Sequence, residues 1–241
     1  MGQVDISTTF ATPTQAGGPL LEAVPESRVP PAAYLPPATR SAKGTRLNRR
    51  GLATRGRILD VAVELLAAGG PDAVSANLIA RAAGVTWGTI QHQFGEADGV
   101  WAAVIEHVSA RPDLYPATAR LALLPLGTCL ETIIEEFWRS LDSPGAQAVG
   151  TLRLFLRRDQ AEVERDYPRT AAALAAWDTR WAEAWDRAFE RLHVPRDRLA
   201  KARSLLPCAV RGLHDAGDLG GCVDIPAGRA GLVEALTLYL S

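Results

Sequence analysis

Cysteine is scarce in this chain of 241 residues, which has only three. They form no close pair, and an odd number argues against a disulfide framework. Cys208, His214 and Cys222 lie near one another in the sequence, but a zinc site needs a fourth ligand and more closely spaced pairs. We therefore predict no metal and no cofactor.

Signals for a membrane or an export route are absent as well. No apolar segment approaches the roughly 20 residues that a membrane span needs. The first basic residue is Arg28, so the positively charged start of a secretory signal is missing. We expect a cytoplasmic protein without a membrane partner.

Charge of one sign is missing from two neighbouring stretches. Residues 1–26 contain no basic residue and carry a charge of −3, whereas residues 27–59 contain no acidic residue and carry +8. The whole chain has a net charge of −1, so the basic segment stands out on an otherwise acidic protein. Such a local concentration of positive charge predicts a polyanionic partner.

Catalytic motifs are also missing. The sequence has no nucleophile elbow, P-loop, G-x-G-x-x-G, H-E-x-x-H or C-x-x-C, and no compelling pair of carboxylates. We therefore predict that the protein is not an enzyme.

The apolar pattern is that of helices. Residues 1–44 hold seven prolines and no apolar period, which predicts a disordered tail. From Thr54 onward the period is helical and no strand pattern is convincing, so the predicted fold class is all-α. The expected amino-terminal helices are Arg55–Ala68 with Thr54 as N-cap, a short helix after Ser75, one over 86–94 and one from about 98. Beyond a break marked by prolines, helices are expected at about 126–141, 144–158, 167–192, 196–216 and 227–240, with Pro207 kinking or dividing the fourth.

A glycine turn joins the second and third expected helices. Gly84 permits a sharp turn and Val85 fills the space between the helices, an arrangement that can place the following helix in a DNA major groove. That helix turns outward the side chains of Thr86, Trp87, Thr89, Gln91 and His92, which can contact base edges, thymine methyls or phosphates. The alternative is a solvated surface helix of a bundle.

Residues 54–108 resemble the TetR family of bacterial transcription regulators. That family's pattern is roughly T-R-x-x-I-L-x-A-A-x-x-L-F-x-x-x-G, then I-A-x-x-A-G-V-S-x-G-T-L-Y-x-H-F. Here it appears as TRGRILDVAVELLAAGG, then IARAAGVTWGTIQHQF, then GEADGVWAAVI. The resemblance implies a homodimer with a three-helix DNA-binding head and a carboxy-terminal ligand-binding bundle, whose last two helices form the dimer interface. Family members are mostly repressors that a small molecule releases from DNA.

The predicted domains follow from the pattern and the resemblance together. We expect a tail at 1–44, a DNA-binding domain at 45–110 with a basic arm at 45–53, and a ligand-binding and dimerisation domain at 111–241. The partners are then a pseudo-palindromic double-stranded DNA operator, a second copy of the chain and a small effector. The alternatives are an activator of the same fold, or an all-α ligand-binding protein or enzyme without specific DNA binding.

The candidate DNA contacts lie in the basic arm and on the second and third helices. They are Arg46, Arg49, Arg50, Arg55, Asn77, Thr86, Trp87, Thr89, Gln91 and His92. Three positions depart from the family pattern: Trp87 replaces a polar residue, Gln91 a phosphate-touching Tyr, and Ala97 a phosphate-gripping Lys. These departures remove charge and a hydroxyl from the backbone contacts, which the arginines of the arm can compensate.

Aromatic residues are the candidates for an effector site. Trp177, Trp181 and Trp185 are spaced four residues apart and form a stripe on one helix face. Such a stripe is usually core, but an aromatic-lined pocket between helices is the functional alternative. The predicted ligand-binding residues are Phe137, Trp138, Phe155, Trp177 and Trp181, and an apolar or aromatic effector is favoured.

Overall fold

The computed structural model describes residues 39–69, 74–111, 114–115, 118–156, 159–220 and 223–241. The described residues all belong to one unit of the chain, which spans 37–241. The predicted disordered tail lies outside the described residues over 1–38.

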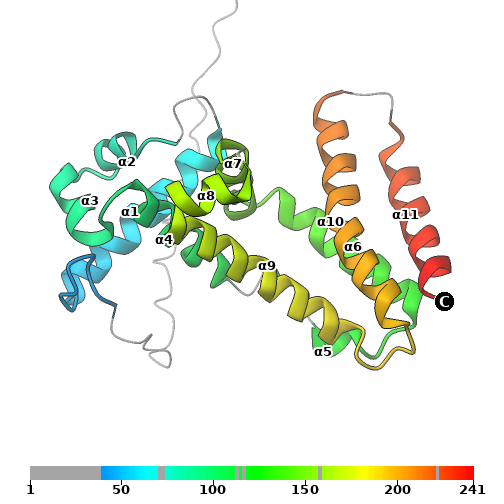
Figure 1. Ribbon diagram of the computed structural model, residues 1–241. Coiled ribbons are helices and arrows are strands. Elements are labelled where there is room, and N and C mark those ends of the chain that lie inside the picture. Colours follow the sequence, from blue (N-terminus) through cyan, green and yellow to red (C-terminus); the bar gives the residue numbers. More distant parts are fainter. Residues whose placement is uncertain (1–38, 70–73, 112–113, 116–117, 157–158, 221–222) are drawn as a thin grey trace, which may run out of the picture. The chain divides into compact units, whose positions relative to one another are not determined.

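The described residues form helices and no strand, which confirms the predicted all-α class (Figure 1). The helices of the amino-terminal part are α1 (Arg49–Ala68), α2 (Ala76–Ala82), α3 (Trp87–Phe94) and α4 (Ala97–Ser109). They are followed by α5 (Thr118–Leu121), α6 (Leu126–Leu141), α7 (Pro144–Phe155), α8 (Gln160–Asp166), α9 (Pro168–Ala188), α10 (Arg196–Asp218) and α11 (Ile225–Leu240).

The first helix begins earlier than its apolar pattern indicated. The Asn48 side chain accepts a hydrogen bond from the backbone N–H of Gly51 at 2.9 Å and caps α1, so Thr54 lies inside the helix rather than at its start. Ser75 caps α2 as expected, and Thr86, which was expected inside the third helix, is the N-cap of α3. The consequence is that Arg49 and Arg50 belong to the first turn of α1 and not to an extended arm.

Residues 39–47 form a folded hairpin, although the sequence assigned 39–44 to the tail. Arg40 and Arg46 are paired in an antiparallel bridge, and the Ser41 N–H donates to the Thr45 carbonyl at 2.8 Å. Gly44 lies in the left-handed region at φ 78°, which makes the tight turn possible. We call residues 39–48 the arm hairpin.

Two short helices, α5 and α8, were not predicted, and α7 and α9 end earlier than expected. Asp159 caps α8 through the Glu162 N–H at 2.9 Å. Tyr167 separates α8 from α9 because a residue before proline is disfavoured in the helical region, and its φ and ψ are −137° and 57°. Pro207 does not divide α10, which runs as one helix through it.

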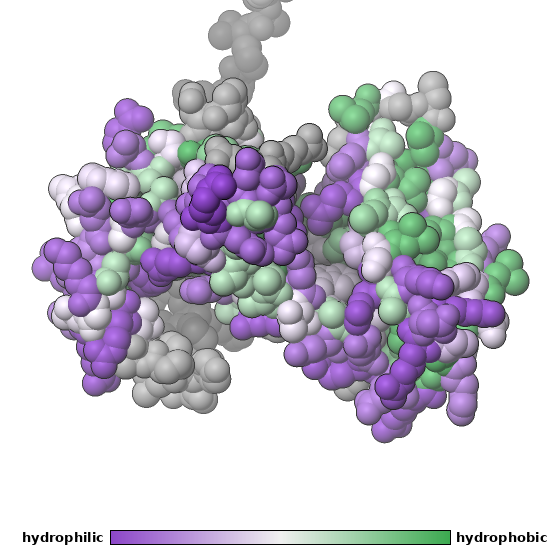
Figure 2. Space-filling view, in the orientation of Figure 1, coloured by the Kyte–Doolittle hydropathy of each residue, from purple (hydrophilic) through white to green (hydrophobic). Residues whose placement is uncertain are grey.

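Two apolar cores stabilise the unit. The first joins α1–α4 with α7 and the start of α9, and Trp101, Phe94 and Ile58 are among its fully buried members. The second joins α6, α10 and α11 with the end of α9, around Ile133 and Trp185. Helix α9 therefore contributes to both cores. Figure 2 shows hydrophobic residues gathered on the surface over α10 and α11.

Candidate nucleic-acid interface

Helices α2 and α3 form a helix-turn-helix. The turn depends on Gly84, whose φ of 65° lies in the left-handed region, and the Val85 N–H donates to the Ala80 carbonyl at 3.0 Å. On α3, Ile90 and Phe94 are buried in the first core and fix which face of the helix turns outward. The sequence prediction of this motif and its turn is confirmed.

The predicted contact residues of α3 lie on its outer face. Gln91 and His92 are exposed, and Trp87 is 38% exposed. Thr89 is half-buried, and its hydroxyl lies 3.0 Å from that of Thr86, so these two side chains are held together at the start of the helix. Asn77 is exposed on α2. The helix therefore presents polar and aromatic groups of the kinds that read base edges in a groove.

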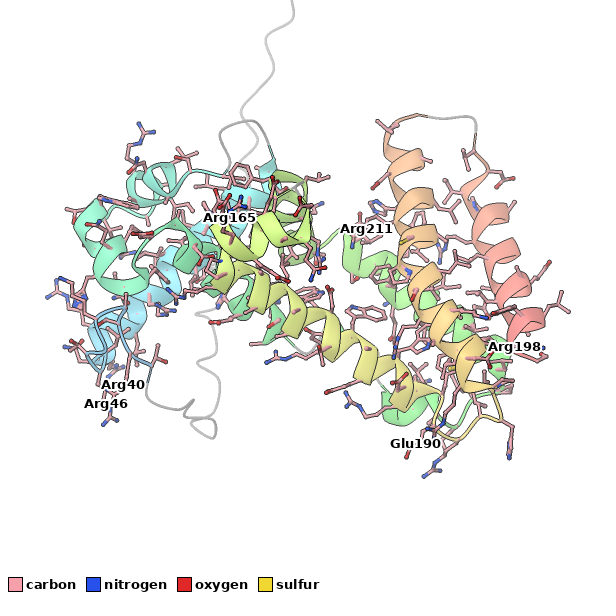
Figure 3. The ribbon with its side chains drawn as sticks, in the orientation of Figure 1. Arg40, Arg46, Arg165, Glu190, Arg198 and Arg211 are labelled. Atoms are coloured by element: carbon pink, nitrogen blue, oxygen red, sulfur yellow. The ribbon has the colours of Figure 1, made fainter. Side chains whose placement is uncertain are left out.

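Positive charge surrounds the start of α1. Arg46, Arg49 and Arg50 are exposed, and Figure 3 shows Arg40 and Arg46 extending outward from the hairpin. The first turns of α1, α2 and α3 all lack an acidic residue. Because a helix start carries partial positive charge, two arginines there oppose the helix dipole and strengthen the attraction for an anion.

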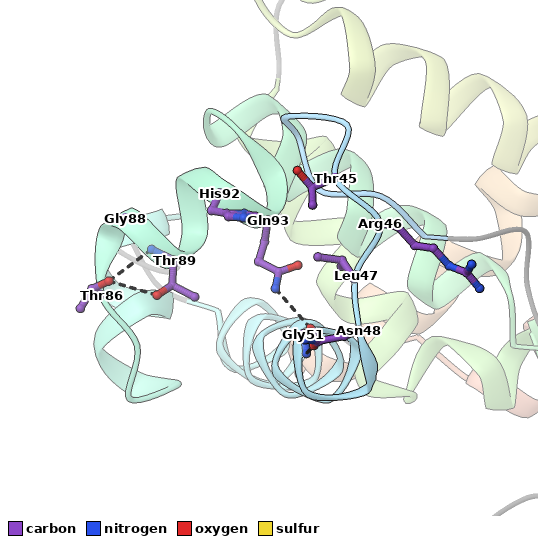
Figure 4. Close-up of a pocket in the computed structure, with 10 residues that line it drawn as sticks. All are labelled: Thr45, Arg46, Leu47, Asn48, Gly51, Thr86, Gly88, Thr89, His92 and Gln93. Carbon is purple, nitrogen blue, oxygen red and sulfur yellow. Dashed lines mark hydrogen bonds between the residues drawn. The ribbon is translucent and has the colours of Figure 1, made fainter.

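A cleft of about 470 Å³ lies between the arm hairpin and α3, the second helix of the helix-turn-helix, which we call the recognition helix (Figure 4). One wall comes from the hairpin and the start of α1, and the other comes from α3. Its lining residues are Thr45, Arg46, Leu47, Asn48, Gly51, Thr86, Gly88, Thr89, His92 and Gln93. None of them is acidic, so a phosphate or sugar edge entering the cleft meets hydroxyl, amide, imidazole and guanidinium groups without repulsion.

Arg55 points inward and not toward the cleft. Its Nη1 donates to the Gln93 carbonyl at 3.0 Å, and its guanidinium lies over the Phe94 ring at 4.3 Å. Burial lowers the pKa of Arg55 from its ordinary value. Unlike Arg46, Arg49 and Arg50, this arginine joins α1 to α3.

Three consecutive carbonyls at the end of α3 each accept a hydrogen bond from a different element. The His92 carbonyl accepts from the Ala42 N–H of the arm hairpin at 3.1 Å. The Gln93 carbonyl accepts from Arg55 of α1 at 3.0 Å, and the Phe94 carbonyl accepts from Nη1 of Arg169 on α9 at 3.0 Å. The last carbonyls of a helix have no partner within it, so these donors both satisfy the helix end and fix its position.

Sequence reasoning missed several residues of this interface. Gln93 is buried on the inner side of α3, and its amide donates to the Gly51 carbonyl at 3.2 Å. Thr45 and Asn48 line the cleft from the hairpin. Asn is a favoured N-cap residue, so Asn48 itself was a possible signal for the start of α1. No local signal indicates that Arg169 reaches α3.

The five predicted effector residues do not form one group. Phe137 and Trp181 pack edge-to-face at 5.0 Å beside the second core. The ring centroids of Trp138 and His214 are 5.1 Å apart. Phe155 is exposed and lies against Tyr167. Trp177 packs with Tyr115 against the first core.

One member of the tryptophan stripe has a buried polar atom without a partner. The Trp185 side chain is 1% exposed, and its indole Nε1 has no hydrogen-bond partner. It packs against Phe189 in the second core. A buried donor of this kind is costly to leave unpaired, which makes it a marker for a missing acceptor.

Other chemistry finds little support in the described part of the chain. No group of three or more histidine, cysteine or acidic side chains there could hold a metal ion, and Cys222 lies outside it. Burial raises the pKa of the Cys129 thiol to about 11, so this thiol is not a nucleophile at neutral pH. None of the described helices is long and apolar enough to cross a membrane.

A helix-turn-helix with an outward polar face beside a basic hairpin is typical of DNA-binding proteins, and comparison with known proteins supports this class. Residues 58–104 match the model of the bacterial regulatory proteins of the tetR family. Over this segment the chain is similar to TetR family transcriptional regulators, whose helix-turn-helix domain implies DNA binding.

Solved structures of regulators share the fold. A tetR-family transcriptional regulator from Streptomyces coelicolor aligns with a TM-score of 0.58 at 17% identity, over 78% of this chain and 80% of that one. A transcriptional regulator from Rhodococcus sp. Rha1 aligns with a TM-score of 0.55 at 15% identity, over 77% and 95%. The search of curated proteins gives no match.

Proposed function

We propose that this regulator is a repressor that binds a pseudo-palindromic operator as a homodimer and leaves it when an aromatic effector binds. The observation that carries the DNA-binding mode is the acid-free cleft between the arm hairpin and α3. Here α3 enters the major groove, and Gln91, His92 and Trp87 reach base edges. Asn77 and the Thr86–Thr89 pair contact the flanking backbone.

Arg46 of the arm hairpin and two arginines at the start of α1 supply the contacts to phosphate. Arg46 lines the cleft, Arg49 and Arg50 follow it at the start of α1, and all three are exposed with no acidic residue in the first turn of that helix. Their charge compensates for the phosphate-touching Tyr and Lys that the family has at positions 91 and 97 and this chain lacks. Each neutralised phosphate releases about one counterion from DNA, so the arm governs the salt dependence of binding.

The triple variant Arg46→Ala, Arg49→Ala and Arg50→Ala should weaken specific and non-specific binding alike. The slope of log affinity against log salt should flatten by up to about three units, because each lost phosphate contact removes about 0.9. Fluorescence anisotropy with a labelled duplex over a salt series measures this. Arg187, Arg191 and Arg196 are also exposed and lie far along the chain, so their triple alanine variant is the control of equal charge.

The single variant Arg55→Ala separates the two roles of arginine in the head. It should leave the slope unchanged, because the guanidinium is bound to Gln93 and Phe94. An unchanged slope in the arm triple, or a flattened slope in Arg55→Ala, would contradict the assignment.

The dimer interface is the outer face of α10 and α11. Leu205 is 56% exposed and Leu238 79%, and small exposed residues recur along the same two helices, among them Cys208, Gly212, Ala227, Gly231 and Ala235. The two helices are antiparallel neighbours, since Arg198 at the start of α10 donates to the Tyr239 carbonyl at the end of α11 at 3.0 Å. An exposed apolar face on two adjacent helices suits a two-fold interface in which each copy buries the same patch.

Replacing Leu238 with Glu should convert the dimer into monomers, because two charges would be buried near the two-fold axis without partners. Sedimentation velocity measures the change in mass. The control is Leu123→Glu, since Leu123 is 68% exposed and lies outside these helices. A Leu238→Glu protein that remains dimeric would place the interface elsewhere.

The effector site lies in the second core at the end of α9. Phe137 and Trp181 offer aromatic faces, and the unpaired indole N–H of Trp185 offers one hydrogen bond to an acceptor on the effector. The supported effector is therefore an aromatic compound with a hydrogen-bond acceptor. Trp138, Phe155 and Trp177 have other neighbours and are left out of this group.

Trp181→Ala should change the response to the effector and leave DNA affinity without effector nearly intact. A thermal-shift screen of aromatic carboxylates, phenols and hydrophobic drugs identifies binders, since a ligand at 100 times its Kd stabilises the protein by about 2.7 kcal/mol. Each binder is then tested for release of DNA, where coupling of about 1–3 kcal/mol is expected. Binders that stabilise the protein without changing DNA affinity would contradict the repressor mechanism.

A further inference from the structure

The amino-terminal end of α9 reaches the recognition helix. The Nη1 of Arg169 donates to the carbonyl of Phe94, the last residue of α3, at 3.0 Å. These two residues are 75 positions apart in the sequence. A helix of the carboxy-terminal half thus supplies a donor to a carbonyl that α3 itself cannot satisfy.

A carboxylate of α4 holds Arg169 in place. The Asp98 side chain accepts from the backbone N–H groups of Arg169 at 3.0 Å and Thr170 at 2.9 Å, and from the Thr170 hydroxyl at 2.7 Å. Helix α9 has no capping side chain at its own N-cap, Tyr167, and Pro168 has no N–H to donate. Asp98 therefore caps α9 from another helix, next to the positive end of its dipole.

The close approach of the three helices requires a glycine. A Cβ on Gly99 would lie 2.0 Å from the Phe94 carbonyl oxygen and 2.3 Å from Nη1 of Arg169. No larger residue fits there without moving the end of α3 or displacing the guanidinium. Gly99 thus allows α4 to begin directly beneath the hydrogen bond between Arg169 and Phe94.

Helices α4 and α9 are also joined at the carboxy-terminal end of α4. Nη1 of Arg180 donates to the Ser109 carbonyl at 3.0 Å and the Ser109 hydroxyl at 3.1 Å, at the last residue of α4. The two contacts join residues at nearly equal separations in the sequence: 72 positions for Asp98 and Thr170, and 71 for Ser109 and Arg180. Helices α4 and α9 therefore run parallel and in register. Helix α9 then continues into the second core with Trp181 and Trp185, and its 21 residues span about 30 Å.

We propose that Arg169 and Asp98 are positioning residues that let α9 set the orientation of the recognition helix. Arg169 holds the end of α3, Asp98 holds the start of α9, and neither needs to touch DNA. A displacement of α9 at the second core then moves α3 directly, through the hydrogen bond of Arg169 to Phe94, as well as through α4. This role rests on the DNA binding proposed above, but the contact itself exists in the free protein.

The first test compares Arg169→Ala with Arg180→Ala. Both arginines lie on α9 and donate through Nη1 to the final residue of a neighbouring helix, but only Arg169 contacts α3. The DNA probes are a genomic fragment selected by the unaltered protein and a scrambled duplex of equal length. Arg169→Ala should weaken binding to the selected fragment about tenfold, within the range of about 5–150-fold for coupled sites. Its affinity for the scrambled duplex and its salt slope should be unchanged, because no phosphate contact is lost.

Asp98→Ala should reproduce the loss of specific affinity, since it releases the start of α9. Arg169→Lys should restore part of it, because an ammonium group can donate one hydrogen bond to the Phe94 carbonyl. Arg180→Ala should keep the specific affinity of the unaltered protein. Equal losses in Arg169→Ala and Arg180→Ala would show general destabilisation and overturn the proposal. A salt slope flattened by about one unit would make Arg169 a phosphate contact and overturn it too.

Hydrogen exchange tests the contact without DNA. In the free protein, Arg169→Ala should speed exchange of the amides at the end of α3 and leave those of α1 unchanged, while Arg180→Ala should do neither. Unchanged exchange at the end of α3 would refute the positioning role even if DNA affinity fell. If the unaltered protein bound no duplex, the proposed operator binding would fail, and the exchange measurement alone would decide the role of Arg169.

Discussion

The end of the recognition helix is fixed by hydrogen bonds that other elements donate to three of its backbone carbonyls, which have no partner within the helix. Those of His92, Gln93 and Phe94 accept from the arm hairpin, from α1 and from α9. A helix of eight residues has little stability of its own, because nucleation is unfavourable and most of its stability comes from packing. The buried Ile90 and Phe94 orient α3, and the three donors fix its end. DNA reading depends on this arrangement because groove contacts tolerate little displacement of the helix.

The distribution of charge follows the same division between holding the helix and contacting DNA. Arg55 and Arg169 donate to carbonyls of α3 and so belong to the structure of the head. Arg46, Arg49 and Arg50 are exposed, and two of them lie in the first turn of α1, where positive charge opposes the helix dipole. Their placement lowers the stability of α1 slightly, and the proposed attraction for phosphate would offset that loss when DNA is bound.

Local signals in the sequence were enough to predict the helix-turn-helix. The glycine turn at Gly84, the cap at Ser75 and the apolar residues of α3 act within a few residues, and all three are present in the structure. The start of α1 was wrong because the cap at Asn48 lies before the apolar period begins. The hairpin before it was missed because its stability comes partly from the contact of Ala42 with His92, which lies 50 residues away.

Direction of a long side chain was harder to predict than its position in a helix. Arg55 and Arg57 look alike in sequence, yet only Arg55 meets the Phe94 ring. The contact between Arg169 and Phe94 joins distant segments and leaves no periodic signal. The aromatic stripe of α9 was recognised, but its members divide between two cores, since Trp177 packs on the first and Trp185 within the second. Which helices lie beside α9 decides this, and spacing along one helix does not contain that information.

A hydroxyl-radical footprint on the promoter beside the protein's own gene tests the central claim most directly. Two copies of α3 held at fixed positions should protect two half-sites on one face of the duplex. Their centres should lie about one helical turn apart, roughly 34–36 Å, or a multiple of that distance. The protection should be related by a two-fold axis. A single continuous protected stretch without two-fold symmetry, or no protection there and no enriched genomic fragment, would contradict a dimer that reads DNA through a rigidly held recognition helix.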